Sequence, residues 1–431
     1  MPTPSDVTDN AARTSASILH TLLDNHHPRN YSIRLWDGST LEAERGHRVR
    51  FTMTIQHPSA LRTMFLRPSE RSLGEAFIYN DFDIEGDLES AFSMAEYLLG
   101  LHLSASERLR LATQLLKLPA NRTSRAGRQP AHLEGKIHSV ERDRGAVTYH
   151  YNTSNEFFSL FLDKRMIYSC AYFQKPNESL DSAQQRKLEY ICRKLRLNQG
   201  DRFLDIGCGW GALVMYAAKR YNVSALGITL SEPQAKLANE RIRQEHLSDR
   251  CRVEVRDYRE IDPLGPFDKL ASIGMVEHVG EQKLPEYFDK TWSILRPGGA
   301  FLNHGIAYPP DPATNLASSF SQAYVFPDGN PVSISASTKY AERAGFEVRD
   351  IESLREHYAL TLRHWVRRLE AHRQQAVKAT DEATYRTWRL FMAASARAFS
   401  TGQYNVFQSL LVKPDNGKSG LPLTRADWYK R

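Results

Sequence analysis

The sequence predicts an α/β protein with a mostly parallel, Rossmann-like sheet of seven strands and a smaller N-terminal α+β domain. Short apolar runs alternate with helical stretches such as 211–221 and 232–246, and this alternation implies a parallel sheet with right-handed crossovers. A glycine-rich turn, Gly207-Cys-Gly-Trp-Gly211, directly follows the first run. The seven predicted strands are 202–206, 223–229, 252–257, 267–273, 300–304, 346–351 and 404–412.

The first 120 residues are predicted to form the separate, smaller domain, associated with lipid or membrane or with dimerisation. A helix is expected at 11–23, strands at 31–36 and 47–55 around an Asp37-Gly38 turn, and a helical stretch at 88–118. Proline, glycine and arginine without apolar periodicity predict a basic linker at 121–145. The main domain then covers 146–415, with a helical insert at 356–399, and a tail follows at 416–431.

Positive charge is concentrated around the predicted linker. Residues 108–144 contain nine Lys or Arg and three Asp or Glu, in a chain of net charge +7. Such a region attracts anionic lipid or nucleic acid, although a solvated linker has the same composition. Within 88–118, Leu109, Ala112 and Leu116 share a helical face beside basic residues. This pattern fits a helix lying on a membrane surface or one packed on its own core.

Composition sets further limits. The 431 residues are 41% hydrophobic and 25% charged, enough for two domains with cores of their own. No apolar run reaches the roughly 18 residues that span a bilayer, and no signal peptide is expected. The four cysteines follow no metal-ligand spacing, so no metal site is predicted and reduced thiols in a cytoplasm are expected.

The glycine turn predicts a bound nucleotide-like cofactor. Gly207 and Gly209 allow a sharp turn and close approach of a ligand, and the following helix offers free N–H groups. A dinucleotide enzyme would place an acid about twenty residues further on to bind ribose hydroxyls. The second strand instead ends Gly227-Ile-Thr-Leu-Ser231, which argues against an ordinary NAD site.

Together these segments resemble the cyclopropane-fatty-acyl-phospholipid synthase family, which includes the mycolic acid cyclopropane synthases and has the class I methyltransferase fold. The resemblance covers most of residues 50–412. The segments that carry it are Ser72-Leu-Gly-Glu-Ala-Phe-Ile-Tyr79, His150-Tyr-Asn152, Tyr168-Ser-Cys-Ala-Tyr-Phe173, Leu204-Asp-Ile-Gly-Cys-Gly-Trp-Gly211, Gly227-Ile-Thr-Leu-Ser231, Gly274-Met-Val-Glu-His-Val-Gly280 and Arg296-Pro-Gly-Gly299.

The resemblance implies transfer of the methyl carbon of S-adenosylmethionine to a cis double bond of a phospholipid acyl chain, forming a cyclopropane ring with bicarbonate as general base. It also implies a peripheral location at the inner membrane surface. A bilayer with unsaturated acyl chains is the expected partner, a homodimer is one candidate assembly, and no nucleic acid is expected. The residues matching the bicarbonate site are Cys170, Glu277, His304, Ile306 and Tyr358.

By the same resemblance, ten residues are expected to contact S-adenosylmethionine. They are Tyr168, Ser169, Asp205, Gly207, Gly209, Thr229, Leu230, Gln234, Asp257 and Tyr258. The chain departs from the family pattern at three places, of which one is Tyr-Asn at 151–152 instead of the commoner Tyr-Asp. The usual His-Thr-Ile is His304-Gly-Ile306, and the usual Phe-Pro-Gly-Gly-x-Leu-Pro-Ser is Phe326-Pro-Asp-Gly-Asn-Pro-Val-Ser333.

Other interpretations stay open at this point. Taken singly, Cys170, His304, Glu277 and Tyr358 have ordinary structural roles, as a buried thiol, a bonded histidine, a helix cap and a core aromatic. Within methyl transfer, the alternatives are a methyl- or methylene-branching fatty-acid methyltransferase and a small-molecule N-methyltransferase. A non-enzymatic lipid-binding protein on the same scaffold is the alternative from another class.

Overall fold

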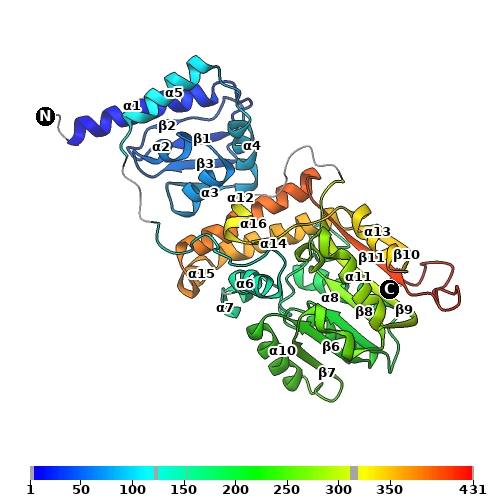
Figure 1. The fold of residues 1–431 in the computed structure, drawn as a ribbon. Coiled ribbons are helices and arrows are strands. Elements are labelled where there is room, and N and C mark those ends of the chain that lie inside the picture. The colour runs from blue at the N-terminus through cyan, green and yellow to red at the C-terminus, as the bar shows by residue number, and fades with distance from the viewer. Residues whose placement is uncertain (1–3, 121–124, 152, 311–318, 430–431) are drawn as a thin grey trace. The chain divides into compact units, whose positions relative to one another are not determined.

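The computed structural model describes residues 4–120, 125–151, 153–310 and 319–429. The chain divides into two compact units (Figure 1). Unit 1 comprises 1–130, 318–324 and 381–397, and unit 2 comprises 131–317, 325–380 and 398–431. The predicted ranges differ from these units, because two segments from the C-terminal half belong to unit 1.

Unit 1 is an α+β domain, as predicted. Its sheet has the order β2-β1-β3-β4, in which β1 pairs parallel with β3 and the other pairs are antiparallel. The strands are β1 (Tyr31–Arg34), β2 (Thr40–Leu41), β3 (Phe51–Ile55) and β4 (Phe82–Gly86). Six helices of unit 1 are α1 (Pro4–Leu23), α2 (Ala60–Phe65), α3 (Glu70–Ile78), α4 (Leu88–Leu99), α5 (Ala105–Lys117) and α12 (Ser319–Tyr324).

The helical stretch predicted at 88–118 is two helices in the structure. Gly100 ends α4, and Ser104 begins α5 with a capping box in which Glu107 reciprocates. Short polar side chains of this kind satisfy the free N–H groups of a helix start. The chain therefore ends one helix at Gly100 and begins another at Ser104, although the helical pattern of the sequence is continuous.

A distant part of the chain completes unit 1. Its α16 (Glu382–Thr401) carries the buried Arg386, whose Nε donates to the Phe77 carbonyl at 2.6 Å and whose Nη2 donates to the Phe82 carbonyl at 2.7 Å. These bonds connect α16 to the end of α3 and to β4. They explain why 381–397, predicted as part of one insert in the main domain, belongs to unit 1.

Unit 2 contains the predicted seven-stranded sheet, in the order β10-β11-β9-β8-β5-β6-β7. Six of the strands run in the same direction. The seventh, β11, lies between β9 and β10 and is antiparallel to both. The strands are β5 (Arg202–Ile206), β6 (Ser224–Thr229), β7 (Cys251–Val255), β8 (Phe267–Ile273), β9 (Leu295–Ala307), β10 (Glu347–Ser353) and β11 (Asn405–Val412). This order and these directions confirm the predicted fold class.

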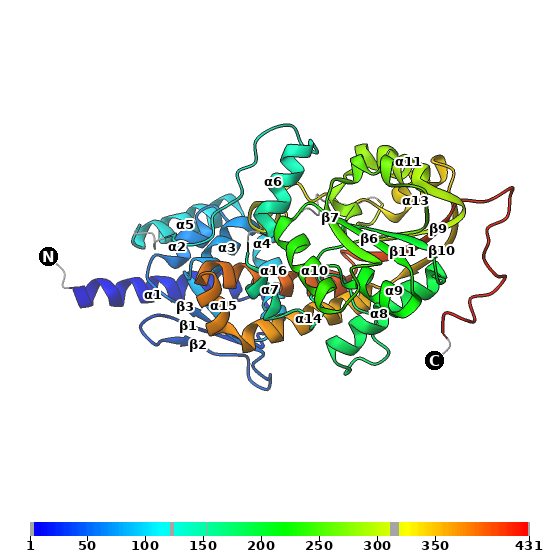
Figure 2. The ribbon, with the colours of Figure 1, turned by 90° about the horizontal axis from the view of Figure 1, so that it is seen from below.

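Helices cover both faces of this sheet (Figure 2). Phe203 packs on one face with residues of α8 (Leu180–Leu195), α9 (Ala212–Tyr221) and α10 (Glu232–Gln244), whereas its neighbour Leu204 packs on the other face with α11 (Leu284–Ile294) and α13 (Ile334–Arg343). Both side chains are fully buried. A strand buried on both faces alternates its side chains between two cores.

Three expectations for unit 2 need revision. The predicted linker 121–145 contains the start of a helix, α6 (Val140–Tyr151), and the predicted insert 356–399 consists of α14 (Arg355–Ala371), α15 (Arg373–Ala379) and most of α16. The segment predicted as a tail packs on the main core, since Trp428 is buried there and Arg196 pairs with Asp427. The remaining helix of unit 2, α7, spans Asn155–Ser159.

Much of the predicted basic region is paired inside its own unit. Arg125 binds Glu75 at 2.8 Å, and Arg128 donates to the Tyr324 carbonyl at 2.7 Å. In unit 2, Arg142 binds Asp328. Arg122 lies outside the described residues. The exposed cations on α5, by contrast, are Arg108, Arg110 and Lys117.

Across the described ranges, no helix is long and apolar enough to cross a membrane. All four cysteines are buried and free.

Candidate functional site

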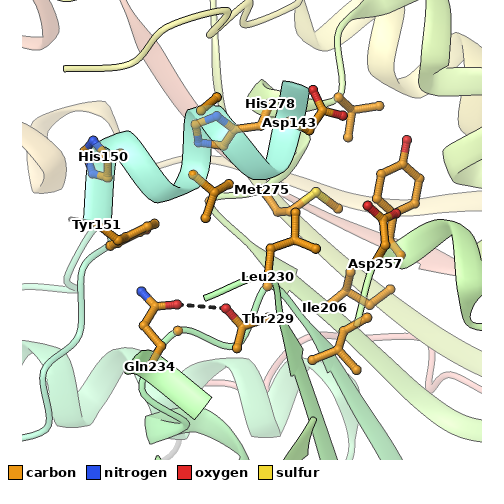
Figure 3. Close-up of a pocket in the computed structure, with 18 of the residues that line it drawn as sticks. Asp143, His150, Tyr151, Ile206, Thr229, Leu230, Gln234, Asp257, Met275 and His278 are labelled. Carbon is orange, nitrogen blue, oxygen red and sulfur yellow. Dashed lines mark hydrogen bonds between the residues drawn. The ribbon is translucent and has the colours of Figure 1, made fainter. Parts of the chain in front are cut away.

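The glycine turn connects β5 to α9 and borders a cavity at the carboxyl ends of the strands (Figure 3). Gly207 and Gly209 have φ values of +79° and +54°, in the left-handed region that favours glycine. A Cβ atom at Gly207 would lie 3.1 Å from Met275. The cavity encloses about 1000 Å³ including its open mouth, and we call it the cofactor cavity. A second pocket of about 560 Å³ shares several of its residues.

The structure brings all ten residues predicted for S-adenosylmethionine contact to these two pockets. Figure 3 shows Thr229 at the end of β6, Gln234 on α10 and Leu230 in the connection between them, all at the cavity. The cofactor cavity is lined by Gly207, Gly209, Thr229, Leu230, Gln234, Asp257 and Tyr258, and the second pocket by Tyr168, Ser169 and Asp205 together with Gly207, Gly209 and Gln234.

Buried polar atoms in the second pocket suit an amino-acid group. Asp205 Oδ1 is buried with no hydrogen-bond partner in the described part of the chain, and burial raises the pKa of Asp205 to about 7, opposed by Lys187. The Lys187 ammonium donates to Ser169 Oγ at 2.8 Å, and burial lowers its pKa to about 8. The methionyl end of S-adenosylmethionine carries an ammonium and a carboxylate, so these two opposite charges fit it.

Lys187 is a site residue that the sequence analysis missed. It lies on α8 in the same buried stripe as Ala183 and Ile191 and is only 2% exposed. A lysine at an apolar helical position is the signal that would have found it, because buried ammonium groups are rare unless they are paired or bind a ligand.

The far end of the cofactor cavity is held by an ionic cluster. Asp257 accepts hydrogen bonds from Arg259 Nε at 2.8 Å and Nη2 at 2.7 Å, and the same Nη2 lies 3.1 Å from Asp143 Oδ2. Asp143 comes from α6, which also contributes His150 and Tyr151 to the cavity wall (Figure 3). The sequence analysis did not predict α6 as a wall of the cavity, because the start of this helix lies in the predicted linker.

Glu277 is the principal acid–base group near the cavity. It lies in the 3-10 turn η3 (Val276–His278), is 8% exposed, and its Oε2 has no hydrogen-bond partner among the described residues. Burial raises the pKa of this carboxyl to about 7, while the backbone N–H groups of Glu277 and Ile306 oppose the shift. A carboxyl that titrates near neutral pH is suited to proton exchange.

Among the other predicted catalytic residues, Ile306 and Tyr358 interact with Glu277, and Cys170 interacts with Tyr358. Burial, with Cys170 and Glu277 as neighbours, raises the pKa of Tyr358 well above its usual value, so Tyr358 stays a neutral hydroxyl. Burial likewise raises the pKa of Cys170, whose thiol lies 3.7 Å from the Leu354 carbonyl. Cys170 is therefore no thiolate nucleophile. Ile306 contributes its backbone N–H, which donates to Glu277.

His304 is connected to the cavity lining by backbone pairing within the sheet. It lies on β9 beside Ile273, and its carbonyl accepts a hydrogen bond from Gly274, a residue of the cavity lining, at 2.8 Å. Burial lowers the pKa of its ring to about 3. Glu277 thus lies between the lining residues Met275 and His278, and His304 bonds to the lining residue Gly274. The catalytic roles of all five residues stay predictions.

Comparison with known proteins identifies the family. Residues 138–409 match the model described as mycolic acid cyclopropane synthetase. The chain belongs to this family. Residues 18–98, within unit 1, match a model described as a domain of unknown function. The resemblance noted from the motifs is therefore confirmed.

Related proteins match this chain over different shares of its length. A probable fatty acid methyltransferase of Pseudomonas putida is 40% identical over 402 residues, 92% of this chain and 96% of its own. Cyclopropane mycolic acid synthase 3 of Mycobacterium tuberculosis is 36% identical over 280 residues, 62% of this chain and 97% of its own.

Solved structures agree with the fold. The cyclopropane synthase MmaA2 from Mycobacterium tuberculosis aligns with a TM-score of 0.60 at 32% identity, over 62% of this chain and 97% of its own. The mycolic acid cyclopropane synthase CmaA1, complexed with SAH and CTAB, aligns with a TM-score of 0.59 at 32% identity, over the same shares of the two chains. The chain is accordingly an S-adenosylmethionine-dependent methyltransferase of the cyclopropane synthetase family.

Proposed function

We propose that the protein transfers the methyl carbon of S-adenosylmethionine to a cis double bond of an unsaturated phospholipid acyl chain and forms a cyclopropane ring. The observation that carries this proposal is Glu277, with its unpartnered carboxyl oxygen and a pKa raised to about 7, directly behind a cofactor cavity. The names of the relatives, a fatty acid methyltransferase and a mycolic acid synthase, support a lipid substrate.

The chemistry requires both the cavity and the base. S-adenosylmethionine supplies an electrophilic methyl group, and its sulfur keeps the bonding electron pair when the alkene takes that carbon. The alkene is left as a carbocation, and removal of one proton from the new methyl group closes the ring. Water would capture the cation, so the site must be dry. Tyr358, which interacts with Glu277, and Cys170, which interacts with Tyr358, are both held neutral and add no charge.

Bicarbonate suits the group of residues around Glu277 and would accept the proton. Glu277 Oε2 is the buried oxygen that still lacks a partner, and the Ile306 backbone N–H and the Tyr358 hydroxyl are donors beside it. An ionised Glu277 favours the protonated form of a neighbouring acid, since two negative charges repel at short range. These residues would therefore bind bicarbonate rather than carbonate.

Helix α5 supports an encounter with the lipid surface. Its Leu111 and Leu115 are buried against unit 1, whereas Leu109 and Leu116 are 71% and 56% exposed on the opposite side. Arg108, Arg110 and Lys117 on the same helix are exposed. Apolar side chains flanked by cations suit an anionic membrane surface. We propose that the protein binds the cytoplasmic membrane face peripherally through α5.

A second candidate is a methyl- or methylene-branched product instead of a ring. The relative that covers 92% of this chain is named a probable fatty acid methyltransferase, and this name specifies no ring. Both products begin with the same methyl transfer to the alkene. They differ in the proton that leaves the cation and in any later reduction.

Incubation of the protein with methyl-labelled S-adenosylmethionine and vesicles of unsaturated phospholipid tests the proposal. Mass analysis of the lipids is expected to show labelled acyl chains, and proton NMR is expected to show the upfield methylene of a cyclopropane ring. Label in a branched chain would favour the second candidate. Unlabelled lipid, or label in an added amine only, would overturn the proposal.

A further inference from the structure

A chain of three buried side chains ends at His304. Lys194 on α8, Gln408 on β11 and His304 on β9 are 0%, 0% and 1% exposed. The Lys194 ammonium donates to Gln408 Oε1 at 3.0 Å, and Gln408 Nε2 lies 3.1 Å from His304 Nδ1. No step proposed above uses Lys194 or Gln408, yet burying an ammonium and an amide requires matched partners.

The chemistry of the donors sets the direction of every bond in this chain. An ammonium only donates, so the oxygen of the Gln408 amide must face Lys194 and its nitrogen must face His304. The amide nitrogen also only donates, so His304 Nδ1 accepts. A neutral imidazole has one accepting and one donating nitrogen, and its hydrogen therefore lies on Nε2.

Carboxylates surround one end of this chain of side chains, and buried surroundings enclose the other. Lys194 Nζ lies 2.5 Å from Glu352 Oε2 and 3.5 Å from Asp350 Oδ2, which compensate its charge. Burial, with the positive charges of Lys187 and Lys194, keeps the pKa of His304 low, at about 3. The imidazole is accordingly neutral at physiological pH, and Gln408 fixes its single tautomer.

We propose that Lys194 and Gln408 are positioning residues that lock His304 as an Nε2–H hydrogen-bond donor toward the anion bound beside Glu277. This inference rests on the proposed function. Within the anion site that the family resemblance implies for His304, it excludes His304 as the base, because an Nε2 that carries a hydrogen has no free lone pair. The proton from the new methyl group then leaves by another acceptor.

Nitrogen-15 NMR of the full-length protein, labelled at histidine and bound to S-adenosylhomocysteine, tests the tautomer directly. The signals of His304 are assigned by their loss in His304→Gln. The expected spectrum has an accepting Nδ1 and a protonated Nε2. A protonated Nδ1 would overturn the proposal, and this result needs no activity assay.

Gln408→Glu supplies the functional test with little change in shape. Its carboxylate still binds Lys194 but accepts a hydrogen bond from Nδ1, so the tautomer is expected to reverse. Turnover should fall on the order of 10²-fold, with unchanged affinity for S-adenosylmethionine. Gln403→Glu, the same change at an exposed position of unit 2, is the control.

Wild-type turnover in Gln408→Glu, with the tautomer reversed, would overturn the positioning role. If Gln408→Glu does not fold, the wild-type spectrum still decides the tautomer. Absence of any methylated lipid with the wild-type protein would count against the proposed function alone. The two proposals therefore fail separately.

Discussion

Arg142 and Asp328 form a two-point ion pair beside the cofactor cavity. Arg142 Nε lies 2.5 Å from Asp328 Oδ2, and Nη2 lies 3.0 Å from Oδ1. The pair joins α6 to the segment 326–328, and both elements line the cavity. Asp328 has φ +60° and stands where the family pattern has glycine. The aspartate thus adopts a conformation that favours glycine, and it gains a charge-assisted contact that glycine lacks.

Asp328→Gly tests whether this pair holds the cavity wall. The substitution relieves the left-handed backbone but leaves Arg142 without its carboxylate, so α6 should open more often. We expect weaker binding of S-adenosylmethionine, by about tenfold if a hydrogen bond to a charged group contributes about 1.5 kcal/mol. Calorimetry gives the affinity and stopped-flow fluorescence the rate of release.

A surface pair provides the control for this experiment. Lys219 and Glu245 are paired with side chains 62% and 51% exposed, so Glu245→Gln should leave the affinity unchanged. Equal affinity and release rate in Asp328→Gly and the wild type would show that the Arg142–Asp328 pair is irrelevant to cofactor retention.

Glu277→Gln should separate catalysis from cofactor binding. The amide keeps the shape of the carboxyl but cannot ionise, so turnover should fall by at least 10²-fold while the affinity for S-adenosylmethionine changes little. Wild-type turnover should decline as the pH falls below about 7, where Glu277 becomes protonated. Equal losses of turnover and affinity in the variant would contradict the assigned role.

The same substitution should also change the pH dependence of stability. Folding raises the pKa of Glu277 from 4.5 to about 7, so between these values the folded protein binds more protons and stability falls as the pH rises. Above pH 7 the cost is on the order of 3 kcal/mol. Urea unfolding should therefore show Glu277→Gln to be the more stable protein at pH 8, with the difference disappearing toward pH 4.5. A constant difference across this range would contradict the assignment.

The features predicted correctly are those that depend on residues close together in the sequence. The alternation of strands and helices and the turn at Gly207 and Gly209 were read from short segments, and the structure confirms them. Partners far apart in the sequence left no such signal. Lys194 meets Gln408 across 214 positions and Arg386 meets the Phe77 carbonyl across 309. The tautomer of His304 and the membership of 381–397 in unit 1 both depend on such pairs.

The motifs identified candidate residues, whereas the structure shows how deeply each one is buried and in which direction its pKa is shifted. It identified Glu277 and Tyr358 as candidates, but the pKa of each depends on burial by other parts of the chain. Lys187 and Asp143 were missed for a related reason. Each is an ordinary charged residue in its own segment and becomes part of a cavity only after α8 and α6 pack against the strand ends.

Replacing Leu109 and Leu116 together by serine tests membrane binding through α5. Both leucines are largely exposed, so the fold should tolerate the change. Each leucine that no longer inserts into the membrane should cost about 1.5 kcal/mol of binding free energy. The affinity of the double variant for vesicles should therefore fall on the order of 10²-fold. Sedimentation with anionic phospholipid vesicles measures the affinity, which should also fall with added salt.

Leu423→Ser is the matched control for this prediction, since Leu423 is fully exposed in unit 2. Turnover of lipid dispersed in detergent should be the same in all variants, because α5 contributes nothing to the cofactor cavity. Vesicle binding by the double variant as tight as that of the wild type would exclude α5 as the docking helix.

Gly305 stands where the family pattern has threonine, and it lies against Val276. A Cβ atom at Gly305 would overlap Val276 Cγ1 and lie 3.2 Å from Glu277 Oε2. Gly305→Thr should therefore displace η3, lower the free energy of unfolding by about 1–3 kcal/mol and reduce turnover. Val276→Ala removes the overlapping methyl groups, so the double variant should recover much of both losses. A double-mutant cycle measured by urea unfolding and turnover checks this, and additive effects would show that the two positions are not coupled.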